Sequence, residues 1–180
     1  AAAAAHNAGA APEFIAQGLN EFRGAKRRFE IVGKINDITI ADDYAHHPAE
    51  LTVTLNAAMQ MGYKRVWAVF QPFTFSRTSM LLDDFVKALS IADKVVLTNI
   101  MGSREKNTLN IFTKDLGDKI DNCIYFDKDK SAEQTNENKQ ADFDKITDYI
   151  CQNASAGDLV ITLGCGDVYK IARAICNKLK

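Results

Sequence analysis

The feature that most constrains the fold is a regular alternation of short apolar runs and amphipathic stretches, which starts near Phe29 and continues to the C-terminus. The apolar runs are short and mostly unpatterned, as expected of strands that are covered on both faces. They are 65–70, 94–97, 123–126 and 158–163. Such an alternation predicts an α/β fold: a Rossmann-like, doubly wound, mostly parallel sheet of about six strands, with helices on both faces.

A β-hairpin is expected to open this alternation. Two β-rich runs, 29–32 and 38–40, flank the turn-forming stretch 33–37. The first of these strands should be the single antiparallel strand at an edge of the sheet. Helices are expected at 48–61, 79–90, 109–116 and 141–151 and after Gly164-Cys165-Gly166, with a surface loop over 127–140.

The N-terminal part of the chain does not follow this alternation. Residues 1–8 and 12–22 predict two short helices that can bury little between them, and a basic, glycine-containing joint follows at 23–28. The chain opens on five alanines without an initiator methionine, which suggests a helix cut in the middle. We therefore expect a fragment of a longer protein, in which 1–26 complete another domain and 27–180 form a domain of their own.

Composition narrows the class of protein. Lysine and arginine number 22 against 23 acidic residues, which argues against a duplex nucleic-acid binder. No apolar run approaches the roughly 18 residues of a membrane span, so no membrane partner is expected. The four cysteines are widely spaced and form no Cys-x-x-Cys pair, which favours reduced thiols in a cytoplasmic protein over zinc or disulfides.

Polar and glycine-rich loops follow four of the predicted strands. In a doubly wound sheet, ligands bind outside the carboxyl ends of the strands. The loops expected there are 42–47, 71–78, 98–105 and 164–167. The sequence therefore predicts a ligand site along this edge.

Several of the loop side chains allow more than one interpretation. His46 and His47 could be metal ligands, although a third ligand would be needed, or a general base, or positioning groups that donate to a substrate oxygen or to Asp43. Tyr44 could stack on a purine or cover the loop. The Gly164-Cys165-Gly166 turn is explained by a tight strand-to-helix connection, and the sequence contains no phosphate-binding loop with a Gly-Lys-Ser/Thr ending.

Arginines near this edge are the candidate anion-binding groups. Arg77, expected just before a helix, could bind a carboxylate or a phosphate, or it could pair with Asp83 or Asp84. Arg27 and Arg28 could hold phosphates or form an ordinary solvated charge run.

Four motifs, taken in order, resemble those of the Mur ligase family of peptidoglycan synthesis. They are Arg27-Arg28-Phe29-Glu30, Asp42-Asp43-Tyr44-Ala45-His46-His47-Pro48, Phe70-Gln71-Pro72 with Phe75-Ser76-Arg77-Thr78, and Gly164-x-Gly166-Asp167. The resemblance covers essentially the whole chain, as the end of the central ATPase domain (1–26) and the C-terminal domain (27–180). Within the family it is closest to the members that join L-alanine to UDP-N-acetylmuramate. One departure is Phe73-Thr74, where the family commonly has a histidine and then a basic residue or threonine.

The resemblance implies an ATP-dependent ligase. ATP would phosphorylate the carboxylate of UDP-N-acetylmuramate, and the amine of L-alanine would attack the acyl phosphate. Mg²⁺ ligands are expected in the missing central domain, and none in this chain. Carried onto this sequence, Tyr44 would lie against adenine, with Asp43 and Arg28 near the nucleotide. His46 would face the reacting centre, with Asp43 as its catalytic companion, and Arg77 would bind the carboxylate of alanine.

Two alternatives stay open. One is the related ligase that attaches a recycled murein tripeptide to the same nucleotide sugar, which shares an Asp-Asp-x-x-His-His-Pro run. The other is a non-catalytic nucleotide-binding module. A glycine-rich Lys-Ser/Thr loop upstream of Ala1 would favour a ligase, and its absence would favour the module.

The 180-residue chain alone is expected to fold but not to catalyse. The resemblance puts the phosphate loop, the magnesium ligands and the sugar-nucleotide domain elsewhere in the protein. The measurement is L-alanine-dependent phosphate release by the isolated chain, and detectable ligation would contradict the expectation.

Overall fold

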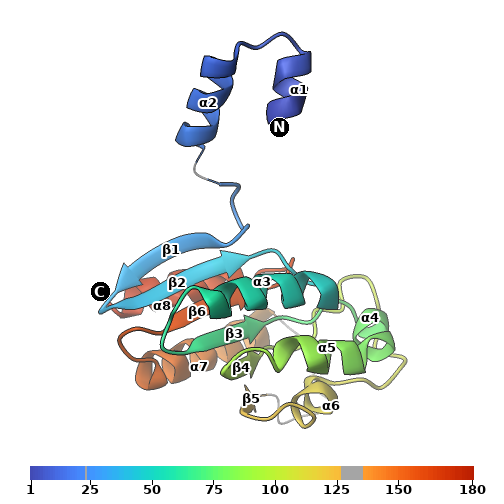
Figure 1. Cartoon of the computed structure of the whole chain (residues 1–180). Helices are drawn as coiled ribbons and strands as arrows, with labels where there is room; N and C mark the ends of the chain where they lie inside the picture. The colour runs from blue at the N-terminus through green and yellow to red at the C-terminus, as the bar shows by residue number, and fades with distance from the viewer. Residues whose placement is uncertain (23, 127–135) are drawn as a thin grey trace.

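A six-stranded sheet with helices on both faces forms the body of the molecule, in a computed structural model that describes residues 1–22, 24–126 and 136–180 (Figure 1). The strands are β1 (Glu30–Ile35), β2 (Ile38–Asp43), β3 (Val66–Phe70), β4 (Lys94–Leu97), β5 (Cys123–Tyr125) and β6 (Leu159–Leu163). Their order across the sheet is β1-β2-β6-β3-β4-β5. Only the β1–β2 pair is antiparallel, and the other neighbours are parallel. The predicted fold class, including the antiparallel edge strand, is confirmed.

Two apolar layers cover the sheet. The helices in the described residues are α1 (Ala2–Asn7), α2 (Pro12–Glu21), α3 (Pro48–Gln60), α4 (Phe75–Met80), α5 (Leu82–Leu89), α6 (Thr113–Gly117), α7 (Asn136–Asn153) and α8 (Tyr169–Lys178). Side chains of α3, α5 and α6 pack on one face, and side chains of α7 and α8 pack on the other. Alternate residues of β3 enter the two layers, with Phe70 in the first and Trp67 in the second.

The β1–β2 hairpin is longer than predicted. Its turn consists of Asn36 and Asp37 alone, which both have positive φ (51° and 61°), as a two-residue hairpin turn of type I′ requires. Strand β2 also extends further than predicted, because Asp42 and Asp43 continue the parallel ladder with β6. Both aspartates are therefore buried strand residues, at 2% and 6% exposure, and not loop residues.

Two helices differ from the prediction. The helix expected at 79–90 is a pair, α4 and α5, and α4 begins at Phe75. The helix expected at 109–116 is only the short α6, because the Asn107 side chain bonds both the amide and the carbonyl of Ile111 and holds that stretch as a turn. Helix α7 starts five residues before the expected 141, and residues 127–135 of the expected loop lie outside the described residues.

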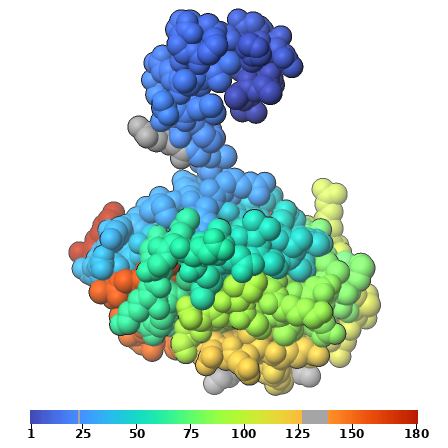
Figure 2. Space-filling model, viewed as in Figure 1, coloured from blue at the N-terminus to red at the C-terminus, as the bar shows by residue number. Residues whose placement is uncertain are grey.

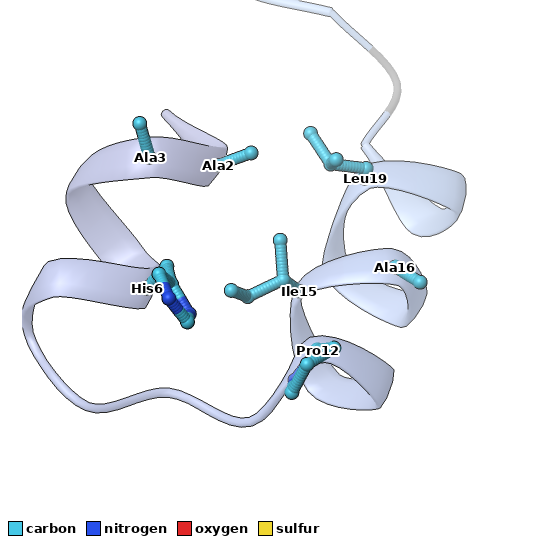
Figure 3. Close-up of a pocket in the computed structure, with 7 residues that line it drawn as sticks. All are labelled: Ala2, Ala3, His6, Pro12, Ile15, Ala16 and Leu19. Atoms are coloured by element: carbon cyan, nitrogen blue, oxygen red, sulfur yellow. The ribbon is translucent and has the colours of Figure 1, made fainter.

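The N-terminal helices pack on each other and leave an apolar surface open. Neither α1 nor α2 contains a buried residue, and Phe14 and Phe22 are both more than 65% exposed, at 68% and 67%. An open groove lies between the two helices (Figure 3), lined by Ala2, Ala3, His6, Pro12, Ile15, Ala16 and Leu19. The pair stands clear of the sheet in both overall views (Figures 1 and 2). Within the described residues, no helix is long and apolar enough to cross a bilayer.

Candidate functional site

The carboxyl ends of β2, β6, β3 and β4 lie side by side and form one edge of the sheet, which we call the rim. Backbone bonds connect neighbouring tips beyond the strands themselves. Gly164 N donates to the carbonyl of Asp43 (3.2 Å), and Gln71 N donates to the carbonyl of Leu163 (3.0 Å). Thr98 N donates to the carbonyl of Phe70 (3.0 Å). The four loops predicted to carry a ligand site therefore leave the sheet along a single edge.

Arg27 clamps two of these tips together. Its Nε donates to Asp42 Oδ2 (2.8 Å), Nη2 donates to the carbonyl of Gly164 (2.6 Å) and Nη1 donates to that of Gly166 (3.1 Å). The other oxygen of Asp42 accepts a bond from Thr162 Oγ1 (2.6 Å), so the buried carboxylate is paired and hydrogen-bonded. Arg27 therefore fixes the segment before β1 to the β6–α8 turn, and it is not a solvated charge.

Aromatic rings lie beside the same guanidinium group. Arg27 Cζ is 5.0 Å from the ring centroid of Tyr44 and 4.9 Å from that of Tyr169. Arg28 lies 5.7 Å from the Tyr44 centroid, and Arg173 lies 4.8 Å from the Tyr169 centroid. Three arginines and two tyrosines thus alternate along the surface, in contacts typical of cation–π attraction.

Asp43 lies at the end of β2 and supports the loop that follows. Its Oδ2 accepts from Phe29 N and its Oδ1 accepts from Ala45 N, both at 2.7 Å. Two backbone amides thus already occupy the two oxygens. Its geometry suits the shaping of the loop that carries Tyr44 and His46.

The two histidines have different surroundings. His47 Nδ1 accepts from Ala49 N (3.3 Å) at the start of α3, so His47 caps that helix. His46 Nδ1 lies 3.1 Å from the carbonyl of Tyr44 and 3.3 Å from Glu50 Oε2. Neither ring bonds Asp43, which was one of the predicted arrangements.

Glu50 holds this loop from the first turn of α3. Its Oε2 accepts from the amides of His46 (2.9 Å) and His47 (3.2 Å). Burial alone would raise the pKa of Glu50, but these two amides and the charge of Arg28 outweigh it and lower that pKa below its ordinary value. Glu50 is therefore a carboxylate at neutral pH.

Arg77 lies within α4 and not before a helix. Its guanidinium carbon is 5.9 Å from the Phe73 ring centroid, and its Nη1 is buried without a hydrogen-bond partner among the described residues. Burial raises the pKa of the Cys165 thiol, and the nearby charges of Arg77 and Arg27 oppose that rise. These contacts direct Arg77 towards the rim, and the suggested partners Asp83 and Asp84 instead lie beside Lys119 and Lys87.

A continuous series of side chains connects the predicted site residues. The Tyr44 and His46 rings are 5.6 Å apart, and the His46 and Phe73 rings are 6.4 Å apart. Phe73 in turn contacts Arg77, and Arg28 lies beside Tyr44. Four of the five predicted residues therefore share one surface, with Asp43 buried beneath it.

The Gly164–Gly166 turn is shaped by close packing. Gly164 has φ +144°, a backbone conformation that favours glycine, and a Cβ on Gly166 would lie 2.2 Å from Gln71 Oε1, so a side chain there would displace the Gln71 amide. Gln71 Nε2 donates to Asp167 Oδ1 (3.2 Å). No group of three His, Cys, Asp or Glu side chains in the described ranges is placed to hold a metal ion.

Sequence reasoning missed four residues that shape the rim: Glu50, Tyr169, Glu105 and Arg27 in its role as a clamp. Glu50 had a local signal, because a glutamate three residues after a capping residue indicates a capping box. The others bind partners that are distant along the chain, such as Gly164 for Arg27, so no local pattern could reveal them.

A family model and curated relatives identify the family of this chain. A family model described as the glutamate ligase domain of Mur ligases matches residues 27–166. UDP-N-acetylmuramate–L-alanine ligases of Acetivibrio thermocellus and Lachnospira eligens are 44% and 45% identical to this chain, over 94% and 88% of it. The chain spans only about a third of these relatives, 34% and 32% of their lengths. The solved structure of the UDP-N-acetylmuramate–alanine ligase of Thermotoga maritima shares the fold, with a TM-score of 0.72 and 23% identity over 98% of this chain and 35% of that one.

Proposed function

Since this chain belongs to the Mur ligase family, we propose that it is the C-terminal domain of an ATP-dependent ligase that joins L-alanine to UDP-N-acetylmuramate in peptidoglycan synthesis. The observation that carries the proposal is the gathering of Tyr44, His46 and Arg77 along the rim. Relatives more than 40% identical to the chain, at 44% and 45%, bear the name of this activity. Residues 1–26 belong, on this proposal, to the end of the preceding ATPase domain.

The surroundings of Tyr44 and Arg28 suit a nucleotide. Tyr44 is 37% exposed, and Arg28 is exposed, with no ion pair within 4 Å among the described residues, although its charge acts on Glu50. An exposed ring offers a stacking face for adenine, and an unpaired guanidinium group attracts phosphate. ATP supplies the phosphoryl group that activates the acceptor carboxylate, and Mg²⁺ is held by residues outside this chain.

Arg77 is the proposed partner of the alanine carboxylate. A guanidinium group binds a carboxylate through two parallel bonds, and Nη1 of Arg77 has no partner among the described residues. The Phe73 ring, beside Arg77, restricts the directions that the guanidinium group can take. Alanine would thus be held by its carboxylate, with its amine free to face the activated carboxyl group.

His46 is the proposed proton acceptor. The carbonyl of Tyr44 can only accept a hydrogen bond, so the Nδ1 of His46 that lies against it must be the donor. In the neutral ring, Nε2 then carries the lone pair and can take a proton from the alanine ammonium group. Asp43 keeps the loop that carries His46 in place through its bonds to Phe29 N and Ala45 N.

The test is an assay of phosphate release by the whole protein that carries this domain. With ATP and UDP-N-acetylmuramate present, we expect release to depend on L-alanine. A murein tripeptide supplied in its place is the competing substrate. Release that depends on the tripeptide and not on L-alanine would assign the recycling ligase instead, and release with neither would point to the non-catalytic module.

Replacement of Tyr44 by alanine should raise the KM for ATP about tenfold, because stacking of a base on an aromatic ring contributes about 1–3 kcal/mol. The KM for L-alanine should change by less than about twofold, because Tyr44 does not contact the amino acid in this proposal. Initial rates at varied ATP measure the effect. Val53→Ala, a 70% exposed apolar position on α3, is the matched control. An unchanged KM for ATP would remove Tyr44 from the nucleotide site.

A further inference from the structure

Glu105 lies on the loop after β4 and reaches the loop after β3. Its Oε1 accepts bonds from Thr74 Oγ1 (2.7 Å) and Ser76 Oγ (2.6 Å), and its Oε2 accepts from Ser76 N (2.9 Å). These partners precede it by 31 and 29 residues in the chain. One exposed carboxylate therefore binds three donors at the start of α4.

The backbone keeps the two loops in register. Phe73 and Met101 form an isolated parallel bridge, and Met101 N donates to the carbonyl of Pro72 (2.8 Å). Glu105 N donates to the carbonyl of Gly102 (3.0 Å), which folds its own loop back. The backbone of the loop that carries Glu105 is thus bonded to the loop after β3 just before α4 begins.

Helix α4 has little else to fix its first turn. It is six residues long, and of its residues only Thr78 is buried. Thr74 stands at its N-cap but makes no capping bond to the helix. So short a helix is marginal on its own, and its first amides have no partners within the helix. The carboxylate of Glu105, which comes from another loop, acts as the cap of α4.

Arg77 follows Ser76 directly, and the direction of its side chain depends on that first turn. Its guanidinium group lies over the ring of Phe73. Phe73 directly precedes Thr74 and Arg77 directly follows Ser76, so each member of this contact is next to a residue that Glu105 binds. The hydroxyl of Ser76, its amide and the hydroxyl of Thr74 lower the pKa of Glu105, which therefore stays ionised at neutral pH. The carboxylate is present in its strongest accepting form under working conditions.

We propose that Glu105 is a positioning residue for amino-acid binding, which holds Arg77 and Phe73 in place through the first turn of α4. This inference rests on the proposed function, in which Arg77 binds the alanine carboxylate. Glu105 touches neither substrate on this account. It acts only through Thr74 and Ser76.

The experiment compares Glu105→Ala, Glu105→Gln and Ser76→Ala in the whole protein. Glu105→Ala should raise the KM for L-alanine about tenfold, with kcat and the KM for ATP changed by less than about threefold. Glu105→Gln should lie between Glu105→Ala and wild type, because its amide keeps one accepting oxygen. The double variant Glu105→Ala/Ser76→Ala should raise that KM by less than the product of the two single effects. Lys106→Ala, the exposed neighbour on the same loop, is the control.

The inference would be overturned if Glu105→Gln and Glu105→Ala left the KM for L-alanine unchanged, or if the KM for ATP rose equally. A measurement that does not depend on enzyme activity distinguishes a failure of this inference from a failure of the proposed function. Hydrogen exchange at the Ser76 amide should be about tenfold faster in Glu105→Ala, since that amide loses its acceptor. If the wild-type protein does not use L-alanine but exchange at the Ser76 amide is faster in Glu105→Ala, the contact between Glu105 and the first turn of α4 is supported and the substrate assignment is wrong. If exchange at the Ser76 amide is unchanged in Glu105→Ala, Glu105 does not hold the first turn of α4 and the inference is wrong.

Discussion

Replacement of Arg77 by alanine is expected to lower kcat/KM for L-alanine about 100-fold to 1,000-fold, which corresponds to about 3–4 kcal/mol for a lost guanidinium–carboxylate pair. The KM for ATP should stay within about twofold of wild type, since the nucleotide is proposed to contact Tyr44 and Arg28 instead. The physical basis is the buried Nη1 of Arg77, which has no partner among the described residues and is proposed to donate to a substrate oxygen. Initial rates of phosphate release, with each substrate varied in turn, give both constants.

Two further variants sharpen this prediction. Arg77→Lys keeps the positive charge but not the planar guanidinium group, so its kcat/KM for L-alanine should be about tenfold higher than that of Arg77→Ala. Lys87→Ala removes a 79% exposed cation on the neighbouring α5 and should behave as wild type. An apparent affinity for L-alanine that survives Arg77→Ala would show that the amino acid is bound elsewhere.

Replacement of Asp158 by alanine is expected to destabilise the fold by about 3 kcal/mol, because it breaks a partly buried ion pair and removes the acceptor of a buried N–H group. The Asp158 side chain is fully buried and accepts four bonds. They come from Arg65 Nε (3.1 Å) and Nη2 (2.6 Å), Trp67 Nε1 (3.0 Å) and Ser155 N (2.9 Å). The variant would leave the buried Trp67 N–H without its acceptor. Urea denaturation of the 180-residue chain measures the change, and Asp148→Ala, at a half-exposed surface pair with Lys178, is the control.

The Asp158 contribution should depend on pH in a defined direction. Burial alone would raise the pKa of Asp158, but bonds from Arg65, the Ser155 amide and Trp67 outweigh it and lower that pKa below its ordinary value. A carboxyl group with a lowered pKa in the folded state stabilises the fold fully above its unfolded pKa of about 3.9. That stability is lost as the pH falls through the folded pKa. The difference in the free energy of unfolding between wild type and Asp158→Ala should therefore be constant around neutral pH, from about pH 6 to about pH 8, and should become smaller below about pH 4. A difference that grew on acidification would contradict the assignment.

Periodicity was enough to predict the sheet, because buried parallel strands such as β3 and β6 are short apolar runs with few alternatives. It failed where polar side chains decide the backbone. Asn107 turns the stretch before α6, and Glu105 accepts a bond from the Ser76 amide in the first turn of α4. Neither effect follows from a periodic pattern in the sequence. Glu105 bonds residues that become its neighbours only after folding, and the turn at Asn107 depends on the bonds that a single side chain makes.

For the candidate site, the sequence predicted which residues lie close together better than it predicted the bonds that they make. The carboxyl ends of parallel strands meet at one edge, so Tyr44, His46 and Arg77 could be expected to share it. The sequence could not show that His47 caps α3 or that Asp43 bonds two backbone amides, since either residue could equally face a ligand. Such distinctions depend on distances of a few tenths of an ångström between side chain and backbone.

The Arg27 clamp has a mechanical consequence. The residues just before it, Gly24, Ala25 and Lys26, are exposed, and Gly24 has φ +89°. Arg27 itself is fastened to Asp42 and to the β6–α8 turn. A pivot in those three residues would therefore move Tyr44, His46 and Arg77 together with the sheet, because Arg27 bonds the segment that follows the pivot directly to the rim.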